Sequence, residues 1–314
     1  MGIALTFPGQ GSQIVGMGRD LCDFFPEARF VFEEVDHVLN QRLSDVIWNG
    51  PQEELTFTHN AQPALTAISM AFIRVMEKNG LCIERDVDYV AGHSLGEYTA
   101  LCAAKAFSLS DTIRLVRARG ESMQKAVPQG LGTMAAIIGL DYSVVDAVCE
   151  QASAMGVCQI ANDNGGNQVV ISGVKDAVQQ AADSCLEKGA KRAVFLPVSA
   201  PFHSSLMAPV SEVMARMLGE VQKNDPLIPV VSNVLASPVS DIAQISQLLV
   251  AQVTGRVRWR ETVQWFVDND IRDIYEVGSG KVLTGLAKRI NKSISAVSIS
   301  TIEDVDVALR AIIG

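Results

Sequence analysis

The sequence contains no apolar run approaching 18 residues, no low-complexity segment and no internal repeat. A helix that crosses a membrane needs about 20 consecutive apolar residues, so we expect no membrane span. The stretch Met1–Phe7 lacks a basic region and leads directly into Pro8-Gly9, so we expect no signal peptide. These absences favour a cytoplasmic globular protein.

Metal-binding and disulfide patterns are missing as well. No two cysteines form a C-x-x-C pair, and no two histidines stand four residues apart, so the sequence predicts no metal site and no disulfide framework. We expect buried, reduced thiols, as is typical of cytoplasmic proteins. The cysteines are Cys22, Cys82, Cys102, Cys149, Cys158 and Cys185.

Positive charge is in the minority, with 26 Lys and Arg against 35 Asp and Glu and a formal net charge of −9. This balance argues against a nucleic-acid partner, which requires a basic surface. Apolar residues, in contrast, make up 48% of the 314 residues. That content is ample for a large core, and the length exceeds one minimal domain.

Strand and helix patterns alternate along most of the chain, which predicts an α/β fold with a mostly parallel sheet covered on both faces. The segment bounded by Pro128-Gln129-Gly130 and Pro197 has the order β-α-β-β-α-β, a ferredoxin-like pattern. We therefore expect a large α/β-hydrolase-like domain formed by residues 1–127 and 198–314, with a small ferredoxin-like domain inserted at 128–197. Within the large domain, a long helix is expected to run from its cap Asn60 to Lys78.

The stretch Val90–Tyr98 contains a G-x-S-x-G motif, with Ser94 between Gly92 and Gly96. The flanking pattern predicts a strand, a sharp turn and a helix. A serine on such a turn occupies strained backbone, and side chains two positions away would clash. The turn would expose the serine hydroxyl beside the amides of a helix N-terminus, which can stabilise an oxyanion. A glycine-rich turn with a solvated serine is the alternative.

A serine nucleophile needs a base, and the chain offers four histidines. His37 and His59 are expected on the surface, and His93 is expected to point away from its neighbour Ser94. His203 lies in the loop Ser199–Ser204, between a predicted strand and helix. Because such loops carry the sites of α/β sheets, His203 is the best candidate base by elimination.

The group that should orient the imidazole is not evident. Each acidic residue that follows His203 is better interpreted as a helix cap or a solvated charge, and a backbone carbonyl could accept the ring N–H equally well. These residues are Asp225, Asp241, Asp268, Asp270 and Asp273.

Two glycine-rich segments suggest nucleotide binding but depart from its motifs. Gly9, Gly11 and Gly16 have the wrong spacing for a dinucleotide fingerprint, so we expect this loop to carry Gln10 towards a site instead. The segment Gly278–Lys281 lacks the Ser or Thr and the first glycine of a P-loop. A further open choice concerns Arg114, Arg117 and Arg119 on one predicted helix, because spacing alone does not distinguish them.

Several stretches together, in this order, resemble one family. They are Phe7–Gln13, Gly92–Tyr98, Arg119-Gly120 with Met123-Gln124, Pro201–Ser204, and Glu276–Leu283. The family is the malonyl-CoA:acyl-carrier-protein transacylases of fatty acid synthesis, and the resemblance extends over essentially the whole chain.

The resemblance implies a role for each matching residue. Ser94 would accept the acyl group, His203 would be its base, and the main-chain carbonyl of Gln252 would orient His203 in place of an acid. The backbone amides of Gln10 and Leu95 would form the oxyanion hole, with Gln10 also at the substrate. Arg119 would pair with the free malonyl carboxylate, a geometry that suits a guanidinium.

At the position beside the histidine, Phe202 is similar to the residue found in malonyl-using members of the family, and it would disfavour branched acyl groups. One departure is Thr254–Val257, where a proline is common in the family; it concerns the local shape of that loop and not the chemistry.

The implied reaction is ping-pong transfer of malonyl from malonyl-CoA to acyl carrier protein, without a metal or other cofactor. We expect a monomer that docks the acidic carrier protein on a basic patch of Lys191, Arg192, Lys288 and Arg289. Scattered solvated charge is the alternative interpretation of those residues. A serine hydrolase with the same Ser94–His203 pair, or a non-catalytic module that binds acyl carrier protein, are the competing functions.

Overall fold

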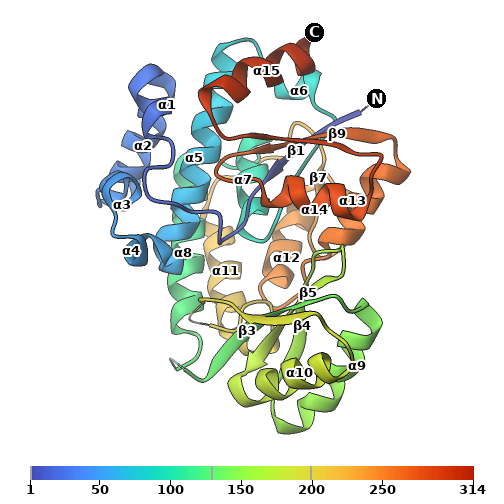
Figure 1. Cartoon of the computed structure of the whole chain (residues 1–314). Helices are drawn as coiled ribbons and strands as arrows, with labels where there is room; N and C mark the ends of the chain where they lie inside the picture. The colour runs from blue at the N-terminus through green and yellow to red at the C-terminus, as the bar shows by residue number, and fades with distance from the viewer. Residues whose placement is uncertain (1, 129, 199) are drawn as a thin grey trace.

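The computed structural model describes residues 2–128, 130–198 and 200–314. Met1 of the N-terminal stretch, Gln129 of the predicted domain boundary and Ser199 of the predicted loop lie outside the described residues. The chain forms a mixed α/β structure with one six-stranded sheet and one four-stranded sheet. In Figure 1 the smaller sheet, with α9 and α10, lies below the larger one, and both chain termini lie at the opposite end.

The larger sheet has the strand order β10-β9-β1-β2-β7-β8. Its pairs are parallel except for the antiparallel β7–β8, which confirms the expected mostly parallel sheet. The strands are β1 (Gly2–Phe7), β2 (Tyr89–Gly92), β7 (Val230–Val231), β8 (Pro238–Val239), β9 (Ile271–Val277) and β10 (Ser295–Ile299).

Apolar helices cover both faces of this sheet. Side chains alternate along a strand, so Leu5 and Phe7 of β1 join one buried cluster and Ala4 joins the other. The first cluster includes α5 (Thr58–Lys78), α7 (Leu95–Ala103), α8 (Leu109–Lys125) and α11 (Ala208–Glu220). The second includes α13 (Trp259–Asp268) and α14 (Val282–Ile290). The remaining elements of this part are α1 (Arg19–Phe24), α2 (Pro26–Leu39), α3 (Leu43–Asn49), α4 (Gln52–Thr56), α6 (Ile83–Asp86), η2 (Ser205–Met207), α12 (Ile242–Gln252) and α15 (Ile302–Ile313).

The long helix α5 begins earlier than its sequence pattern predicts. It starts at Thr58 after Phe57, so Asn60 is not its cap. The Asn60 amide instead donates to the Glu54 carbonyl at 2.9 Å, which ties the helix to α4. Helix α8 packs tightly beside this start, because a Cβ on Gly120 would lie 2.7 Å from the His59 Cα. The glycine therefore permits the close approach that brings Arg119 inward.

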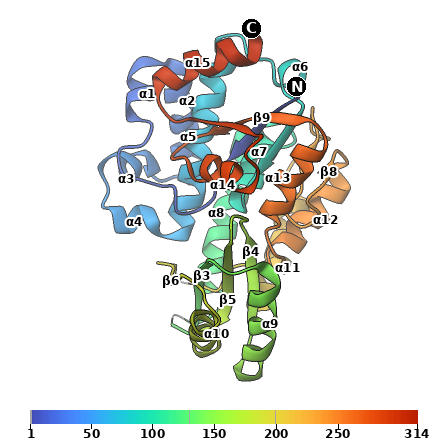
Figure 2. The same ribbon diagram turned by 45° about the vertical axis from the view of Figure 1, so that its right-hand side comes forward.

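The smaller sheet has the order β4-β5-β3-β6, and its pairs are antiparallel. Its elements follow as β3 (Gly132–Ile138), α9 (Tyr142–Ala152), η1 (Ser153–Met155), β4 (Cys158–Asp163), β5 (Gln168–Val174), α10 (Lys175–Glu187) and β6 (Arg192–Phe195). Ala135 and Ile137 of β3 pack in the cluster under α9 and α10, whereas Met134 and Ala136 join the core of the larger unit. One face of the small sheet is therefore buried by its own helices, and the other contributes to the large core (Figure 2).

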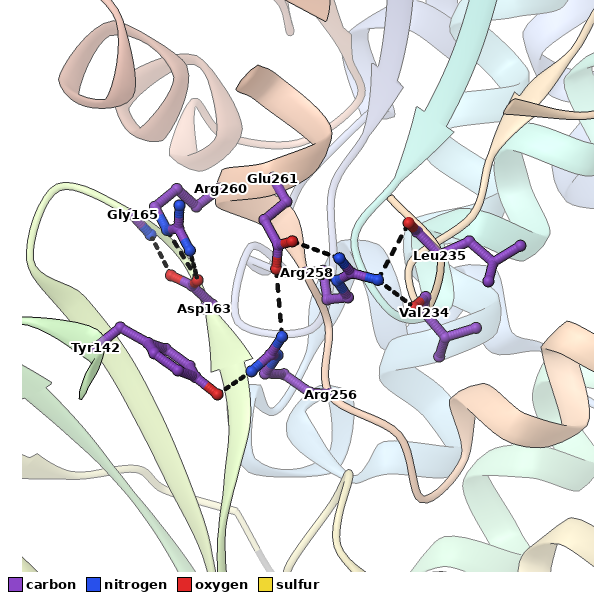
Figure 3. Close-up of polar contacts among 9 residues, drawn as sticks. All are labelled: Tyr142, Asp163, Gly165, Val234, Leu235, Arg256, Arg258, Arg260 and Glu261. Atoms are coloured by element: carbon purple, nitrogen blue, oxygen red, sulfur yellow. Dashed lines mark hydrogen bonds and ion pairs between the residues drawn. The ribbon is translucent and has the colours of Figure 1, made fainter. Parts of the chain in front are cut away.

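Polar contacts also join the two units. Asp163 of β4 pairs with Arg260 at 2.8 Å, and Arg256 extends between Tyr142 of α9 and Glu261 of α13 (Figure 3). The backbone of Val257 bonds to Ala161 and Asp163, so the segment before α13 lies along β4. Among the helices that the structure describes, none is long and apolar enough to cross a membrane.

Candidate active site

Ser94 lies at the tip of the turn between β2 and α7. Its backbone has φ 55° and ψ −108°, a region that non-glycine residues rarely occupy. A Cβ on Gly92 would lie 1.9 Å from the Gly96 backbone, and one on Gly96 would lie 2.2 Å from the Phe7 carbonyl oxygen. The predicted strand–turn–helix and the predicted clashes at both flanking positions are thus confirmed.

Ser94 and His203 meet although 109 residues separate them. The Ser94 Oγ lies 2.7 Å from the His203 Nε2. On the other side of the ring, Nδ1 is 2.9 Å from the Gln252 carbonyl oxygen and 3.0 Å from that of Gly255. Because carbonyls only accept, Nδ1 carries the proton and Nε2 is free to accept from the serine hydroxyl.

The environment of His203 keeps its ring neutral. The side chain is buried, and burial together with the nearby charge of Arg119 lowers the pKa of His203 to about 3. An imidazole in this state is unprotonated at neutral pH, as a general base must be.

The acidic residues after His203 lie elsewhere. Asp241 caps α12 by accepting from the Ala243 amide, and Asp225 accepts from the Ile242 amide. Asp270 pairs with Arg272 on the surface. Within the described residues, no carboxylate contacts the His203 ring.

Arg119 is the basic residue of α8 that reaches the serine. Its side chain is only 1% exposed, and Nη2 lies 3.1 Å from Ser94 Oγ and 2.9 Å from Gln252 Oε1. Nη1 donates to Gln62 Oε1 at 3.0 Å. Arg114 instead pairs with Asp111 on the surface, and Arg117 bonds to Asn60 and Gln41. The structure thereby separates three residues that spacing alone leaves equivalent.

A cavity of about 170 Å³ opens in front of the serine, between the two units. It is lined by Gln10 and Leu95 beside Ser94, and by Phe202 beside His203. Among the described residues, the backbone amides of Gln10 and Leu95 donate to no protein acceptor, so both are available to a ligand. The Gln10 side chain donates to the Thr58 hydroxyl at 3.3 Å.

The other histidines differ in position. His37 is exposed, as expected, whereas His59 is half-buried and its ring lies 2.6 Å from the Gln124 Oε1. His93 bonds through Nε2 to Asn164 Oδ1 at 2.9 Å, away from the serine hydroxyl as predicted, and burial lowers the pKa of its ring.

A buried polar network behind the Ser94 turn, the nucleophile elbow, was not predicted. Asn233 Oδ1 accepts from the Ser94 amide at 2.7 Å, and its Nδ2 donates to the Gly92 carbonyl at 2.6 Å. Glu97 accepts from the Gln252 side chain at 2.7 Å, and burial raises the pKa of Glu97 to about 7. The G-x-S-x-G-E pattern places Glu97 one turn from the serine, but nothing in the sequence pairs it with residues more than 130 positions away.

Four basic residues are exposed: Lys191 directly before β6, Arg192 at its first position, and Lys288 and Arg289 in the last turn of α14. Among the described residues, no group of three or more His, Cys, Asp or Glu side chains is arranged to hold a metal ion.

Comparison with known proteins places this arrangement in a family. The model of the acyl transferase domain matches residues 5–303. The chain is 41% identical to the malonyl CoA-acyl carrier protein transacylase of Bacillus subtilis, covering 99% of this chain and 97% of that protein. Its counterpart in Escherichia coli K12 is 43% identical, with 93% and 94% covered.

Solved structures agree over the whole length. An acyl-carrier-protein S-malonyltransferase from Bartonella henselae superposes with a TM-score of 0.99 at 57% identity, with 100% of both chains covered. A malonyl-transacylase solved in complex with a type II polyketide acyl-carrier protein has a TM-score of 0.96 at 40% identity, with 99% and 100% covered. A nucleophile elbow, a neutral histidine and a buried arginine converge on one cavity in a chain with these relatives. The chain therefore belongs to the acyl transferase domain family and, within it, to the malonyl-CoA:acyl-carrier-protein transacylases.

Proposed function

We propose that this chain transfers the malonyl group from malonyl-CoA to the phosphopantetheine thiol of acyl carrier protein, through a malonyl ester on Ser94. The observation that carries the proposal is the double contact of Ser94 Oγ, with His203 Nε2 at 2.7 Å and Arg119 Nη2 at 3.1 Å. A base on one side activates the hydroxyl. A buried guanidinium on the other side suits an acyl group that ends in a carboxylate.

In the first half-reaction, His203 Nε2 accepts the Ser94 proton while Oγ attacks the thioester carbonyl of malonyl-CoA. The carbonyl oxygen becomes an oxyanion, which the amides of Leu95 and Gln10 stabilise. When the intermediate collapses, the C–S bond breaks, CoA leaves as its thiol with the proton from His203, and malonyl remains on Ser94.

In the second half-reaction, His203 accepts the proton of the phosphopantetheine thiol, which attacks the serine ester. The Ser94 C–O bond then breaks, and Oγ regains its proton from His203. The Nδ1 contacts with the carbonyls of Gln252 and Gly255 hold the ring in one tautomer through both halves.

Two residues select the acyl group. Arg119 binds the distal carboxylate, and Phe202 at the cavity wall restricts branching beside it. All steps use side chains and backbone amides of this chain, so no cofactor is needed.

The acyl carrier protein is the proposed partner, in line with the relative solved in complex with such a protein. Lys191, Arg192, Lys288 and Arg289 would form its docking patch on a monomeric, cytoplasmic enzyme. We propose further that residues 1–127 and 198–314 form an α/β-hydrolase-like domain and residues 128–197 a ferredoxin-like one. The antiparallel order β4-β5-β3-β6 supports the second assignment.

The decisive test is incubation with malonyl-, methylmalonyl- or acetyl-CoA, followed by intact mass measurement. We expect a malonyl adduct on the wild type, much less adduct with the other two, and none on Ser94→Ala. Added holo acyl carrier protein should remove the adduct and gain the malonyl mass. Equal adducts with all three donors would contradict the malonyl assignment, and rapid loss of the adduct to water alone would favour a hydrolase.

A further inference from the structure

Glu97 is a buried carboxylate that no step of the proposed reaction uses. It belongs to the first turn of α7 and is 2% exposed. Its Oε2 accepts from the Gln252 Nε2 at 2.7 Å and from the Asn233 backbone amide at 3.3 Å. A carboxylate is rarely buried without partners, and both partners here belong to segments that support the elbow.

The side chain of Gln252 joins Glu97 to Arg119. Its Oε1 accepts from Arg119 Nη2 at 2.9 Å, while its Nε2 donates to Glu97 and, also at 2.9 Å, to the Ser94 carbonyl. A primary amide has one accepting end and one donating end, and a guanidinium can only donate. Acceptors at Glu97 and at the Ser94 carbonyl, with the donor at Arg119, together leave one orientation of the amide that satisfies every contact.

Asn233 depends on the same carboxylate. Its backbone amide donates to Glu97, and its side chain holds the Ser94 amide and the Gly92 carbonyl. Glu97 thus contacts both Gln252 and Asn233, two residues from distant segments that each bond to the serine turn.

We infer that Glu97 is a positioning residue for acyl selectivity: as one of two acceptors at the Gln252 Nε2, it helps to hold the Gln252 amide in place, and through it the direction in which Arg119 faces the acyl carboxylate. Glu97 itself does not line the cavity, so it acts through Gln252 and not on the substrate. The inference rests on the proposed function, because it assigns Arg119 to the malonyl carboxylate.

The experiment measures the rates of acyl-Ser94 formation from malonyl-CoA and from acetyl-CoA, and takes their ratio. Glu97→Ala removes one of the two acceptors of the Gln252 Nε2 and leaves the Ser94 carbonyl alone to hold that end of the amide. We therefore expect the malonyl-to-acetyl ratio to fall about tenfold or more, the effect of one lost buried hydrogen bond. The acetyl group has no carboxylate for Arg119, so the rate of acyl-Ser94 formation from acetyl-CoA should fall less. Glu97→Gln retains an oxygen that accepts from Gln252, so its ratio should stay within about threefold of wild type.

A matched control separates positioning from the loss of any buried carboxylate. Glu276 is fully buried at the end of β9 and accepts from the amides of Leu283 and Thr284, away from the cavity. Glu276→Ala should lower stability and leave the ratio unchanged. If Glu97→Ala does not fold, Glu97→Asp, which shortens the reach to Gln252, should shift the ratio in the same direction by a smaller factor.

A ratio for Glu97→Ala within twofold of wild type would overturn the inference, and so would an equal shift in Glu97→Gln. Failure of the proposed function is distinguishable, because the wild type would then form no malonyl adduct on Ser94.

Discussion

Ser94 and His203 are the residues for which sequence reasoning went furthest. The glycines around Ser94 are required because a side chain at either position would clash with nearby backbone. Such a local constraint can be recognised from the sequence motif. His203 followed by elimination among four histidines. The group that orients its ring could not be found as a side chain, because the acceptors are the carbonyls of Gln252 and Gly255. Every residue has a carbonyl, so no residue type marks this role.

Arg119 could not be distinguished by spacing from two neighbouring arginines. Its burial depends on the close approach of α8 to α5 at Gly120, a tertiary contact that a single helix pattern does not reveal. Glu97 and Asn233 escaped prediction for the same reason, since their partners are remote in sequence.

The buried state of His203 predicts an unusual pH profile. An ordinary histidine has a pKa near 6.5 and would lose its base form progressively below that pH. With the pKa lowered to about 3, His203 stays neutral, so the rate of Ser94 acylation should remain flat as the pH falls from about 7.5 to about 5.5. The acylation rate at each pH can be measured by stopping the reaction at set times and determining the intact mass of the protein.

Glu97→Gln is the appropriate control for this profile, because it removes Glu97, whose pKa of about 7 lies within the pH range tested, and it should give the same flat curve. An acid limb with its midpoint near pH 6.5 in both proteins would show that His203 is readily protonated.

Arg119→Ala should reduce malonyl loading about 100-fold or more, because a buried carboxylate would lose its partner. Acetyl loading should fall far less. Arg114→Ala, a surface change on the same helix, is the control and should leave both rates unaltered. Undiminished malonyl loading in Arg119→Ala would remove this residue from the proposed mechanism.

At the scale of elements, long amphipathic segments were predictable and short ones were not. The long helix expected from Asn60 to Lys78 is present as α5 at Thr58–Lys78. The helices α1, α3, α4 and α6 have four to seven residues, too few to repeat an apolar period. The helix that follows the Ser94 turn ends at Ala103, and Lys105 adopts φ 63° just beyond it.

Two helical glycines should respond oppositely to alanine. A Cβ on Gly120 of α8 would press on the α5 backbone, so Gly120→Ala should lower the free energy of unfolding and displace Arg119. A Cβ on Gly219 of α11 would meet no atom within 4 Å, so Gly219→Ala should add up to about 1 kcal/mol. Urea unfolding measures both, and similar shifts for the two variants would contradict the packing argument.

For the molecule as a whole, the sequence indicated an inserted β-α-β-β-α-β segment and a mostly parallel large sheet. It could not indicate that Met134, Ala136 and Val170 of the small sheet join the core of the larger unit. Which unit buries an apolar face depends on how the two units pack, and the alternation of a strand does not carry that information.

The contact between the units should be measurable at Asp163 and Arg260. Asp163 is buried and Arg260 is half-exposed, so solvent screens part of their attraction, and we expect Arg260→Ala to cost about 1 kcal/mol of unfolding free energy. The variant Asp163→Asn and the double variant complete a double-mutant cycle, which gives the coupling energy between the two side chains. A coupling energy near zero would mean that the pair does not stabilise the junction.

The position of β1 has a consequence for synthesis of the chain. β1 is an interior strand whose partners are β2, about 85 residues later, and β9, about 270 residues later. Ribosomes add roughly 5–20 residues per second, so one edge of β1 waits for tens of seconds after the other has paired. Through that interval the nascent chain presents an open apolar strand edge, which is the kind of surface that chaperones shield and that promotes aggregation when translation stalls.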